Sequence, residues 1–468
     1  MAAAVRSTVR ALVAVGLLLG AAGAIAQPAA ANSKQTMFFE APRDLTAAGT
    51  TDAGRAAAFK TLTSLGVHAL RVNLRWYDVA PAADQSAKPA FDATDPAAYA
   101  WGAYAATIDA AKKLGWTVLI SPSSPAPKWA TEAGTDTVTR PKADEFKLFT
   151  QAVAKRFGGA NVLYSIWNEP NLDTSLKPQV VGGQFVAGRI YRDLFVAGRD
   201  GIRTVTPAAK VLFGELAPSG LVEGRQRPID FLRDALCVSG KGVFDKTCGK
   251  LTIDGVADHP YRSIPGIPKS TDDVTYAVVP RLARALDDFA KAGAIGAEVP
   301  IYLTQFGIQS YPDKIFGEPV QDQLEERARA ERIAYGNPRV VGFSQYLLSD
   351  DVATGPGQYG GFESGLLLAD GTPKRTLDAF RLVMDVSPIT KAESIWGLVR
   401  PTTKATTVTI QRKLGKKTWA TFKTVKTRAN GTFLVKDKLH SKVEYRYRWK
   451  SPTLGTLTSP AVEPYDPS

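Results

Sequence analysis

Eight short apolar runs divide the first part of this 468-residue chain, and longer amphipathic segments separate most of them. β runs that alternate with helices predict a parallel sheet covered by helices, and eight of them over about 350 residues predict a (β/α)8 barrel. An open doubly wound sheet is the main rival, but it favours a glycine-rich turn where this chain has Glu40-Ala41-Pro42-Arg43. The runs are Thr36–Phe39, Ala69–Leu74, Thr117–Ser121, Val162–Trp167, Val211–Gly214, Gly255–Ala257, Ile301–Thr304 and Val340–Tyr346.

The chain changes character after Pro388, because long helical patterns end there. Short strand-like runs follow, separated by turn signals such as Asn430-Gly431. We therefore expect a barrel domain over residues 35–385 and a small antiparallel β module, sandwich-like, over residues 391–468. The predicted strands of the module are Thr406–Gln411, Thr418–Val425, Thr432–Val435 and Val443–Trp449.

Positive charge is concentrated in the predicted module. The chain has 58 Lys and Arg against 45 Asp and Glu, a net charge of +13. Residues 391–468 hold 16 Lys and Arg against 5 Asp and Glu, which is +11 of that total. Such a module on an exported protein can bind an anionic cell-wall or surface polymer, although a lysine-rich soluble face explains the charge equally well. Nucleic acid is not expected as a partner, because export argues against it.

The first 26 residues have the features of a signal peptide. Arg6 and Arg10 form a basic start, Ala11–Ala26 is a short apolar run, and Ala24-Ile25-Ala26 is a small-x-small cleavage pattern. An uncleaved membrane anchor is the alternative. No later run is long and apolar enough to span a bilayer, so we expect a secreted or cell-surface protein without a stable membrane span after cleavage.

The two cysteines, Cys237 and Cys248, lie close together in a polar, glycine-containing segment. In an oxidising compartment this pattern predicts one local disulfide. The three histidines are scattered along the chain, so no metal site is expected. The motifs of phosphate-binding and dinucleotide-binding loops are also missing, so the sequence indicates no cofactor.

The motif Ile166-Trp167-Asn168-Glu169-Pro170-Asn171 stands at the predicted C-terminal end of the fourth strand, where barrel enzymes build their active sites. Here the chain resembles the retaining (β/α)8 glycoside hydrolases, the clan that includes the family 5 cellulases and family 39. The resemblance implies hydrolysis of O-glycosidic bonds, with Glu169 as the general acid/base and Asn168 bonded to the sugar 2-hydroxyl. The chemistry agrees, because a Glu at a strand tip can protonate the leaving oxygen.

The strand 7 segment departs from the clan. In the clan this segment carries the nucleophile in a Thr-Glu-Phe/Tyr-Gly context, whereas this chain reads Thr304-Gln305-Phe306-Gly307. A neutral amide is a very poor nucleophile, so the covalent intermediate of the retaining reaction should not form on Gln305.

Four interpretations of Gln305 stay open. The protein can be a glycan-binding or wall-associated pseudoenzyme with little turnover. Another carboxylate can serve instead: Glu215 at the end of strand 5, Glu40 at the end of strand 1, or Glu363 or Asp350 near strand 8. A substrate with a 2-acetamido group can supply its own nucleophile. Finally, the glutamine can be an engineered change or a sequence artefact.

Further site residues follow from the resemblance. Arg71 matches the strand 2 Arg that steadies the nucleophile, and it would lose its anionic partner beside Gln305 unless another acid approaches. His259 and Tyr261 at the end of strand 6 would bind sugar hydroxyls or the strand 7 side chain. Tyr346 on strand 8 offers a smaller stacking face than the tryptophan that the clan often has there. Trp167 is a candidate for the cleft floor, or equally for the core.

Overall fold

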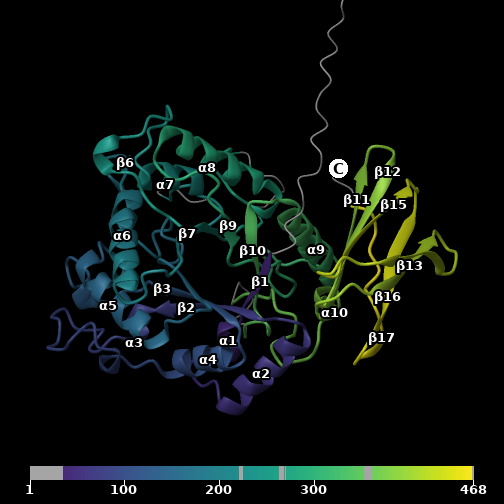
Figure 1. Ribbon diagram of the computed structural model, residues 1–468, viewed down its shortest axis with the longest axis horizontal. Helices are drawn as coiled ribbons and strands as arrows, with labels where there is room; N and C mark the ends of the chain where they lie inside the picture. The colour runs from purple at the N-terminus through teal and green to yellow at the C-terminus, as the bar shows by residue number, and fades with distance from the viewer. Residues whose placement is uncertain (1–34, 221–224, 263–267, 269, 353–360, 466–468) are drawn as a thin grey trace, which may run out of the picture.

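The computed structural model describes residues 35–220, 225–262, 268, 270–352 and 361–465 (Figure 1). The predicted signal peptide, residues 1–26, lies outside the described residues. Within the described ranges, a helix-rich barrel on one side is joined to a β-rich module on the other. None of the helices in these ranges has both the length and the apolar character needed to cross a bilayer.

Eight parallel strands close into a barrel in the order β1-β10-β9-β8-β7-β4-β3-β2. The pair Phe39↔Leu70 joins β1 to β2 and closes the cylinder, and the pair Glu40↔Tyr346 ends the β1–β10 ladder. The predicted (β/α)8 barrel is therefore confirmed. The strands are β1 (Thr36–Glu40), β2 (Ala69–Arg75), β3 (Thr117–Ser123), β4 (Val162–Ser165), β7 (Val211–Leu216), β8 (Val256–Asp258), β9 (Ile301–Leu303) and β10 (Val340–Tyr346).

Helices surround the barrel, as Figure 1 shows. The larger ones are α2 (Asp52–Ser64), α4 (Gly102–Lys113), α5 (Ala143–Phe157), α6 (Ala187–Val205), α7 (Pro228–Ala235), α8 (Pro280–Ala292), α9 (Val320–Gly336) and α10 (Arg375–Arg381). Short helices α1 (Pro42–Leu45) and α3 (Trp76–Val79) follow β1 and β2, and a small hairpin, β5 (Val180–Val181) and β6 (Gln184–Phe185), precedes α6.

Helices α5 and α6 pack closely because α6 has glycines where they meet. A Cβ atom at Gly201 would lie 2.3 Å from the Lys147 carbonyl oxygen, and one at Gly198 would lie 2.8 Å from the Phe146 ring. The other buried positions of α6, such as Tyr191, Leu194 and Phe195, recur at the spacing of one helix face. Tyr191 and Phe195 of this face pack against Phe213 of β7, and the Tyr191 hydroxyl donates to the carbonyl oxygen of Ile166, which follows β4.

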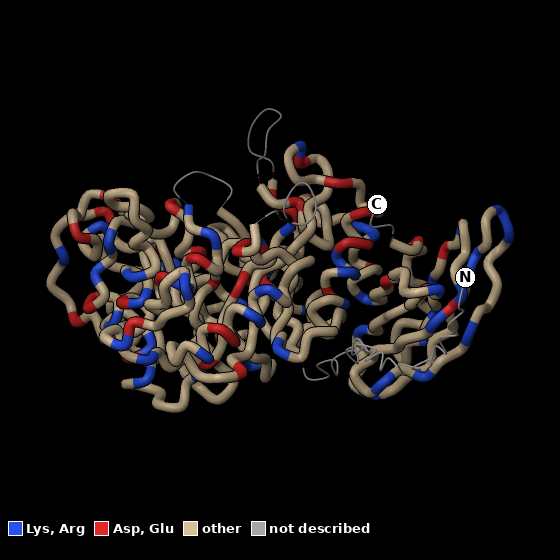
Figure 2. The backbone as a smooth tube through the Cα atoms, turned by 90° about the horizontal axis from the view of Figure 1, so that it is seen from above, with Lys and Arg blue, Asp and Glu red and all other residues tan. Residues whose placement is uncertain are grey.

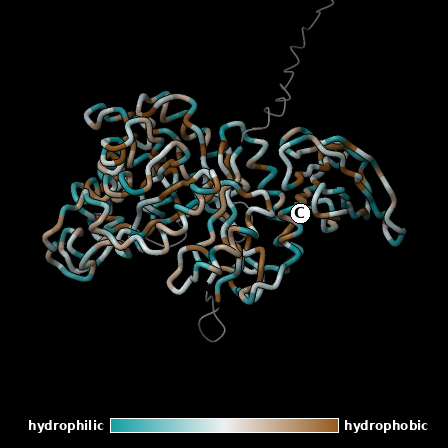
Figure 3. Tube along the Cα trace, turned by 60° about the horizontal axis from the view of Figure 1, so that its bottom comes forward, coloured by the Kyte–Doolittle hydropathy of each residue, from teal (hydrophilic) through white to brown (hydrophobic). Residues whose placement is uncertain are grey.

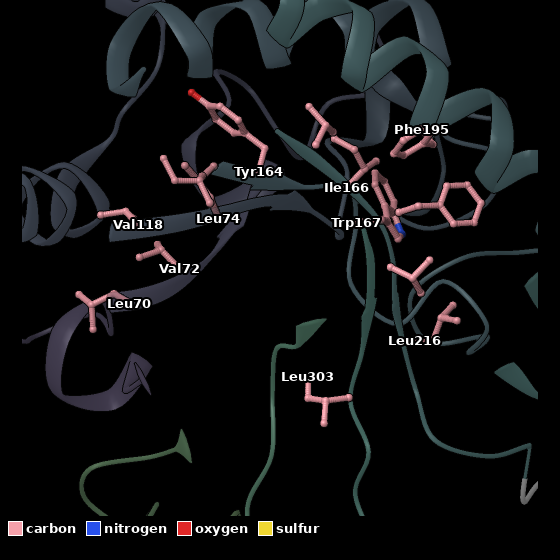
Figure 4. Packing of buried hydrophobic residues seen from close by; sticks show 14 of the residues in the cluster. Leu70, Val72, Leu74, Val118, Tyr164, Ile166, Trp167, Phe195, Leu216 and Leu303 are labelled. Atoms are coloured by element: carbon pink, nitrogen blue, oxygen red, sulfur yellow. The ribbon is translucent and has the colours of Figure 1, made fainter. Parts of the chain in front are cut away.

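The core continues from the helix–strand layer to the end of β4. Many hydrophobic residues, brown in Figure 3, are buried in the interior of the protein. Figure 4 shows Trp167 among apolar side chains, including Ile166 and Phe195. Trp167 is 0% exposed, and its indole nitrogen donates to the Ser175 carbonyl oxygen (3.0 Å).

The C-terminal module consists of two antiparallel sheets around one apolar cluster. One sheet has the order β11-β12-β15 and the other β14-β13-β16-β17. Strand β11 begins at Leu382, before the expected start of the module at Lys391, because the chain passes from α10 into the sheet without a loop. The strands are β11 (Leu382–Ile389), β12 (Ala392–Val399), β13 (Thr407–Leu414), β14 (Ala420–Lys426), β15 (Thr432–Lys438), β16 (Val443–Ser451) and β17 (Gly455–Thr458).

Helix α9 connects the barrel to the module through buried charges. The Glu331 carboxylate of α9 pairs with Arg400 of the module and with Arg327 of its own helix (2.8 Å). Arg332 of α9 pairs with Asp385 of β11 (2.6 Å). Because breaking buried pairs is costly, these contacts fix the module against the barrel.

A disulfide between Cys237 and Cys248 follows α7, as the sequence predicts. The side chain of Arg189 on α6 lies 2.7 Å from the Cys237 sulfur and 2.9 Å from the Cys248 sulfur. The disulfide therefore ties the loop after α7 to the outside of α6.

Candidate active site

A cleft of about 1310 Å³ opens at the C-terminal ends of the barrel strands. Its lining comes from residues that end or follow β1, β2, β4, β7, β8, β9 and β10. This is the face on which barrel enzymes carry their active sites. The lining includes Glu40, Asn73, Asn168, Glu169, Ala217, Tyr261, Gln305 and Tyr346, together with Trp101, Tyr104, Phe316 and Phe362.

Glu169 projects into this cleft from the turn after β4. Its side chain is 22% exposed, and its backbone amide donates to the Glu215 carbonyl oxygen (2.7 Å). The backbone of Glu169 is left-handed (φ 46°), as is that of Trp167 (φ 72°). A left-handed backbone at a residue other than glycine costs about 1–3 kcal/mol and is concentrated at functional sites. The turn therefore stores strain to aim this carboxyl group.

His259, after β8, lies between two carboxylates. Its Nδ1 is 3.0 Å from Oε1 of Glu169, and its Nε2 is 2.6 Å from Oε2 of Glu215. Burial alone would lower the pKa of His259, but the hydrogen bonds to Glu169 and Glu215 outweigh it and raise the pKa to about 9. His259 is therefore charged at neutral pH, and both of its ring nitrogens donate.

Glu215, at the end of β7, is 0% exposed and is surrounded by donors. Thr304 donates to it (2.7 Å), and Ser165, Ser121 and Arg71 also contact it. Burial would raise the pKa of Glu215, but the charge of Arg71 and the hydrogen bond from His259 outweigh burial and lower it. Glu215 is thus an ionised anchor beneath the cleft and cannot contact a substrate.

Arg71 of β2 joins three acceptors. Its Nη1 lies 2.5 Å from Oε2 of Glu40, and its Nη2 lies 3.0 Å from Oε2 of Glu215 and 2.8 Å from Oδ1 of Asn168. Burial would lower the pKa of Arg71, but Glu215 and Glu40 raise it above its usual value. Arg71 therefore keeps two anionic partners although Gln305, after β9, is neutral. Arg71 also orients the Asn168 amide.

Gln305 follows β9 and lines the same cleft as Glu169. Its Nε2 donates to Oε2 of Glu40 (3.0 Å), the oxygen that also accepts from Arg71. The position after β9, the seventh strand of the barrel, thus holds a neutral amide that is hydrogen-bonded to the carboxylate of Glu40 at the end of β1.

Aromatic side chains form part of the cleft wall. The Tyr346 and Phe362 rings meet edge to face at 5.2 Å, and the Tyr261 ring lies 6.0 Å from that of Phe362. The Tyr261 hydroxyl is buried and has no hydrogen-bond partner among the described residues, and its burial raises the pKa well above the usual value. An unpaired buried hydroxyl is a group that an ordered water or a ligand can satisfy.

The predicted site residues fall into two groups. Glu169, Gln305, Asn168, Tyr261, Tyr346 and Glu40 line the cleft. Arg71, His259 and Glu215 are buried behind it, where they hold the cleft residues rather than a sugar, and Trp167 lies in the core. Cys237 and Cys248 form the disulfide near α7 and are not part of the cleft lining.

Sequence reasoning missed several contributors. Thr304 and Ser165 hold Glu215, and Trp101 and Tyr104 line the cleft from the start of α4. Thr304 could have been found, because it directly precedes Gln305 at a strand end. The α4 aromatics carry no motif, so only the fold brings them to the cleft. In the parts of the chain that the structure describes, no three His, Cys, Asp or Glu residues are grouped to hold a metal ion.

Residues 31–198 match the cellulase family, glycosyl hydrolase family 5. A glucosidase from Croceicoccus marinus has a similar structure, with a TM-score of 0.51 at 12% identity, over 90% of this chain and 97% of that one. The predicted resemblance to the (β/α)8 glycoside hydrolases is confirmed. At this identity the structural likeness shows the fold, and no curated protein matches the chain.

Two further structures are similar at lower scores. A Bacteroides uniformis β-glucuronidase has a TM-score of 0.46 at 11% identity, over 93% of this chain and 46% of that one. The xylanase XynB from Paenibacillus barcinonensis also has a TM-score of 0.46, at 13% identity, over 75% of this chain and 98% of that one. The family match over residues 31–198 supports a function that acts on glycans.

Proposed function

We propose that this protein hydrolyses O-glycosidic bonds of an oligo- or polysaccharide, with Glu169 as the proton donor. The observation that carries the proposal is the partly exposed carboxyl group of Glu169, which a left-handed backbone places in a cleft of about 1310 Å³. Pockets for drug-sized ligands measure about 300–1,000 Å³, so this volume suits a ligand of several sugar rings. The aromatic wall suits the apolar faces of such rings.

The contacts of Glu169 orient its carboxyl group within the cleft. His259 holds Oε1 at 3.0 Å. Among the described residues no hydrogen bond reaches Oε2, which is the oxygen left to face the glycosidic bond. His259 is itself fixed by Glu215, so the carboxyl group of Glu169 is held in one direction. General acid catalysis by a positioned side chain contributes typically 10²–10⁴-fold to a rate.

Gln305 limits what the site can do. An amide cannot form the glycosyl ester of a double displacement, so the usual retaining route lacks its nucleophile. We expect slow turnover in the parent protein. The second candidate function is glycan binding without turnover, which the same glutamine favours.

The test is a comparison of the parent with Gln305→Glu and Glu169→Gln variants on 2,4-dinitrophenyl and 4-nitrophenyl β-glycosides. We expect Gln305→Glu to raise turnover by the retaining route, because it places a carboxylate across the cleft from Glu169, beside the Glu40 carboxylate that Arg71 binds. Glu169→Gln should abolish turnover of the 4-nitrophenyl substrates. If parent and Gln305→Glu neither turn over nor bind any glycan, the hydrolase proposal fails.

We further propose that the protein is exported and that its β module binds an anionic wall or surface polymer. Figure 2 shows the module on the right, with many blue and few red segments. Along β16, Val443, Tyr445, Tyr447 and Trp449 are buried, so the alternate residues Arg446, Arg448 and Lys450 point outward. The outward residues repeat about every 6.8 Å along the strand, so the three cations form a row.

Hydroxyl groups surround these cations on the same face of the sheet. Arg448 is paired across the sheet with Thr409 of β13 and with Thr458 of β17. Arg446 lies over the Trp419 ring (4.2 Å). Cations, hydroxyls and one aromatic ring on a flat face suit an acidic polysaccharide.

The module is best tested with point variants, because its deletion would expose the buried charges of α9. We expect replacement of Arg446, Arg448 and Lys450 by Gln to weaken retention on immobilised alginate at low salt. The matched control replaces Lys404, Lys436 and Lys438 by Gln, which removes the same charge elsewhere in the module. An equal loss of retention in both variants would indicate that the net charge of the module alone determines binding. Unchanged retention of the variant at Arg446, Arg448 and Lys450 would refute the binding face.

A further inference from the structure

Glu40 occupies the position that gives the site a second carboxylate. It ends β1, lines the cleft and is 5% exposed at its side chain. Its Oε2 accepts from Arg71 (2.5 Å) and from Gln305 (3.0 Å). No hydrogen bond among the described residues reaches its Oε1. One oxygen is therefore anchored, and the other is available for chemistry.

The order of strands places Glu40 opposite Glu169. In the barrel, β9 and β1 flank β10 on its two sides, and each is three strands away from β4. Glu40 therefore stands across the barrel from Glu169 much as Gln305 does. Burial is the main cause that raises the pKa of Tyr261, and the charges of both Glu40 and Glu169 raise it further.

The depth of Glu40 indicates how it can act. Gln305 is partly exposed, whereas Glu40 is buried beside it. A sugar ring in the cleft therefore meets Gln305 first, and a water molecule is small enough to reach Glu40. The strand 7 carboxylate of a retaining hydrolase lies about 5–5.5 Å from the acid, and the two groups of an inverting hydrolase lie about 6.5–9.5 Å apart. Glu40 lies one 3.0 Å hydrogen bond beyond Gln305, and this deeper position suits the wider spacing of the inverting hydrolases, which leaves room for a water molecule.

We propose that Glu40 is the general base of this site and that the barrel hydrolyses glycosides with inversion. This inference rests on the proposed hydrolase function. Water attacks the anomeric carbon while Oε1 of Glu40 takes its proton. The bond from the anomeric carbon to the leaving oxygen breaks, and that oxygen takes the proton of Glu169. Glu40 ends protonated and Glu169 ionised, and exchange with solvent restores both.

Arg71 and Gln305 have supporting roles in this scheme. Arg71 and the Gln305 amide bind Oε2 and so fix the plane of the Glu40 carboxylate. The side-chain oxygen of Gln305, which lines the cleft, can accept a hydrogen bond from the attacking water. Gln305, at the position of the clan's nucleophile, would thus position the attacking water instead of forming a covalent bond to the anomeric carbon.

The experiment measures the anomer of the first product by proton NMR. The probes are 2,4-dinitrophenyl β-glycosides of glucose, xylose, galactose and mannose, compared for the parent, Glu40→Gln and Glu132→Gln. Glu132 is the control, since it is exposed and pairs with Arg140. We expect the parent to release the α-anomer first, Glu40→Gln to lose at least about 100-fold in turnover, and Glu132→Gln to match the parent.

A double variant covers the case in which Glu40→Gln does not fold. Glu40→Gln combined with Gln305→Glu keeps the charge beside Arg71, and it should turn over with release of the β-anomer. A β-anomer from the parent overturns the inference, as does a parent rate unaffected by Glu40→Gln. Turnover in Gln305→Glu but none in the parent also overturns it and leaves the proposed function standing. No turnover in any of these variants refutes the proposed function itself.

Discussion

Loss of the proton from His259 should lower the free energy of unfolding of this protein at alkaline pH. The pKa of His259 is raised from 6.5 to about 9 in the folded state. A group whose folded pKa lies above its unfolded value contributes stability that is fully present below pH 6.5 and is lost as the pH rises through 9. A pKa raised from 6.5 to about 9 corresponds to about 3 kcal/mol of unfolding free energy.

The assay is urea unfolding of the parent and of a His259→Gln variant at intervals between pH 6 and pH 9.5. The difference in unfolding free energy between the two proteins should shrink by about 3 kcal/mol across this range. The difference isolates His259 from other groups, such as Glu363, whose pKa burial and the charge of Asp313 raise to about 7. A difference that does not change with pH would refute the charged His259 between Glu169 and Glu215.

Two further predictions concern stability. Replacement of both Cys237 and Cys248 by Ser should lower the free energy of unfolding by about 3 kcal/mol, since the disulfide closes a short loop; equal denaturation curves for the two proteins would contradict this. Glu331→Gln leaves Arg400 and Arg327 without their carboxylate and should cost about 3–5 kcal/mol. Calorimetry should then show the module unfolding before the barrel, and one unchanged transition would contradict the role of α9 as the connection.

The barrel could be predicted from the sequence because each strand is a compact apolar run bounded by helix or turn signals. The predicted run Ile301–Thr304 and the observed strand Ile301–Leu303 agree closely. The start of the module was missed, because Leu382–Ile389 contains Pro388 and directly continues α10, so it does not stand out as a strand.

The site was predictable only in part. The strand-end position of Glu169 follows from its motif, but the left-handed turn after β4 changes which side chains face the core, so Trp167 points inward. The partners of Arg71 come from strands 1 and 5, far from it in sequence, and they depend on the register of the closed barrel. A single sequence does not reveal that register.

The central claim, that Glu169 donates the proton to the leaving oxygen, is tested most directly by varying the leaving group. Turnover by Glu169→Gln is compared with the parent on a 2,4-dinitrophenyl and a methyl glycoside of the same sugar. The dinitrophenyl group leaves without a proton, whereas methanol needs one. We predict a loss of at least about 100-fold for the methyl glycoside and a much smaller loss for the dinitrophenyl glycoside. An equal loss on both substrates would contradict the assignment of Glu169.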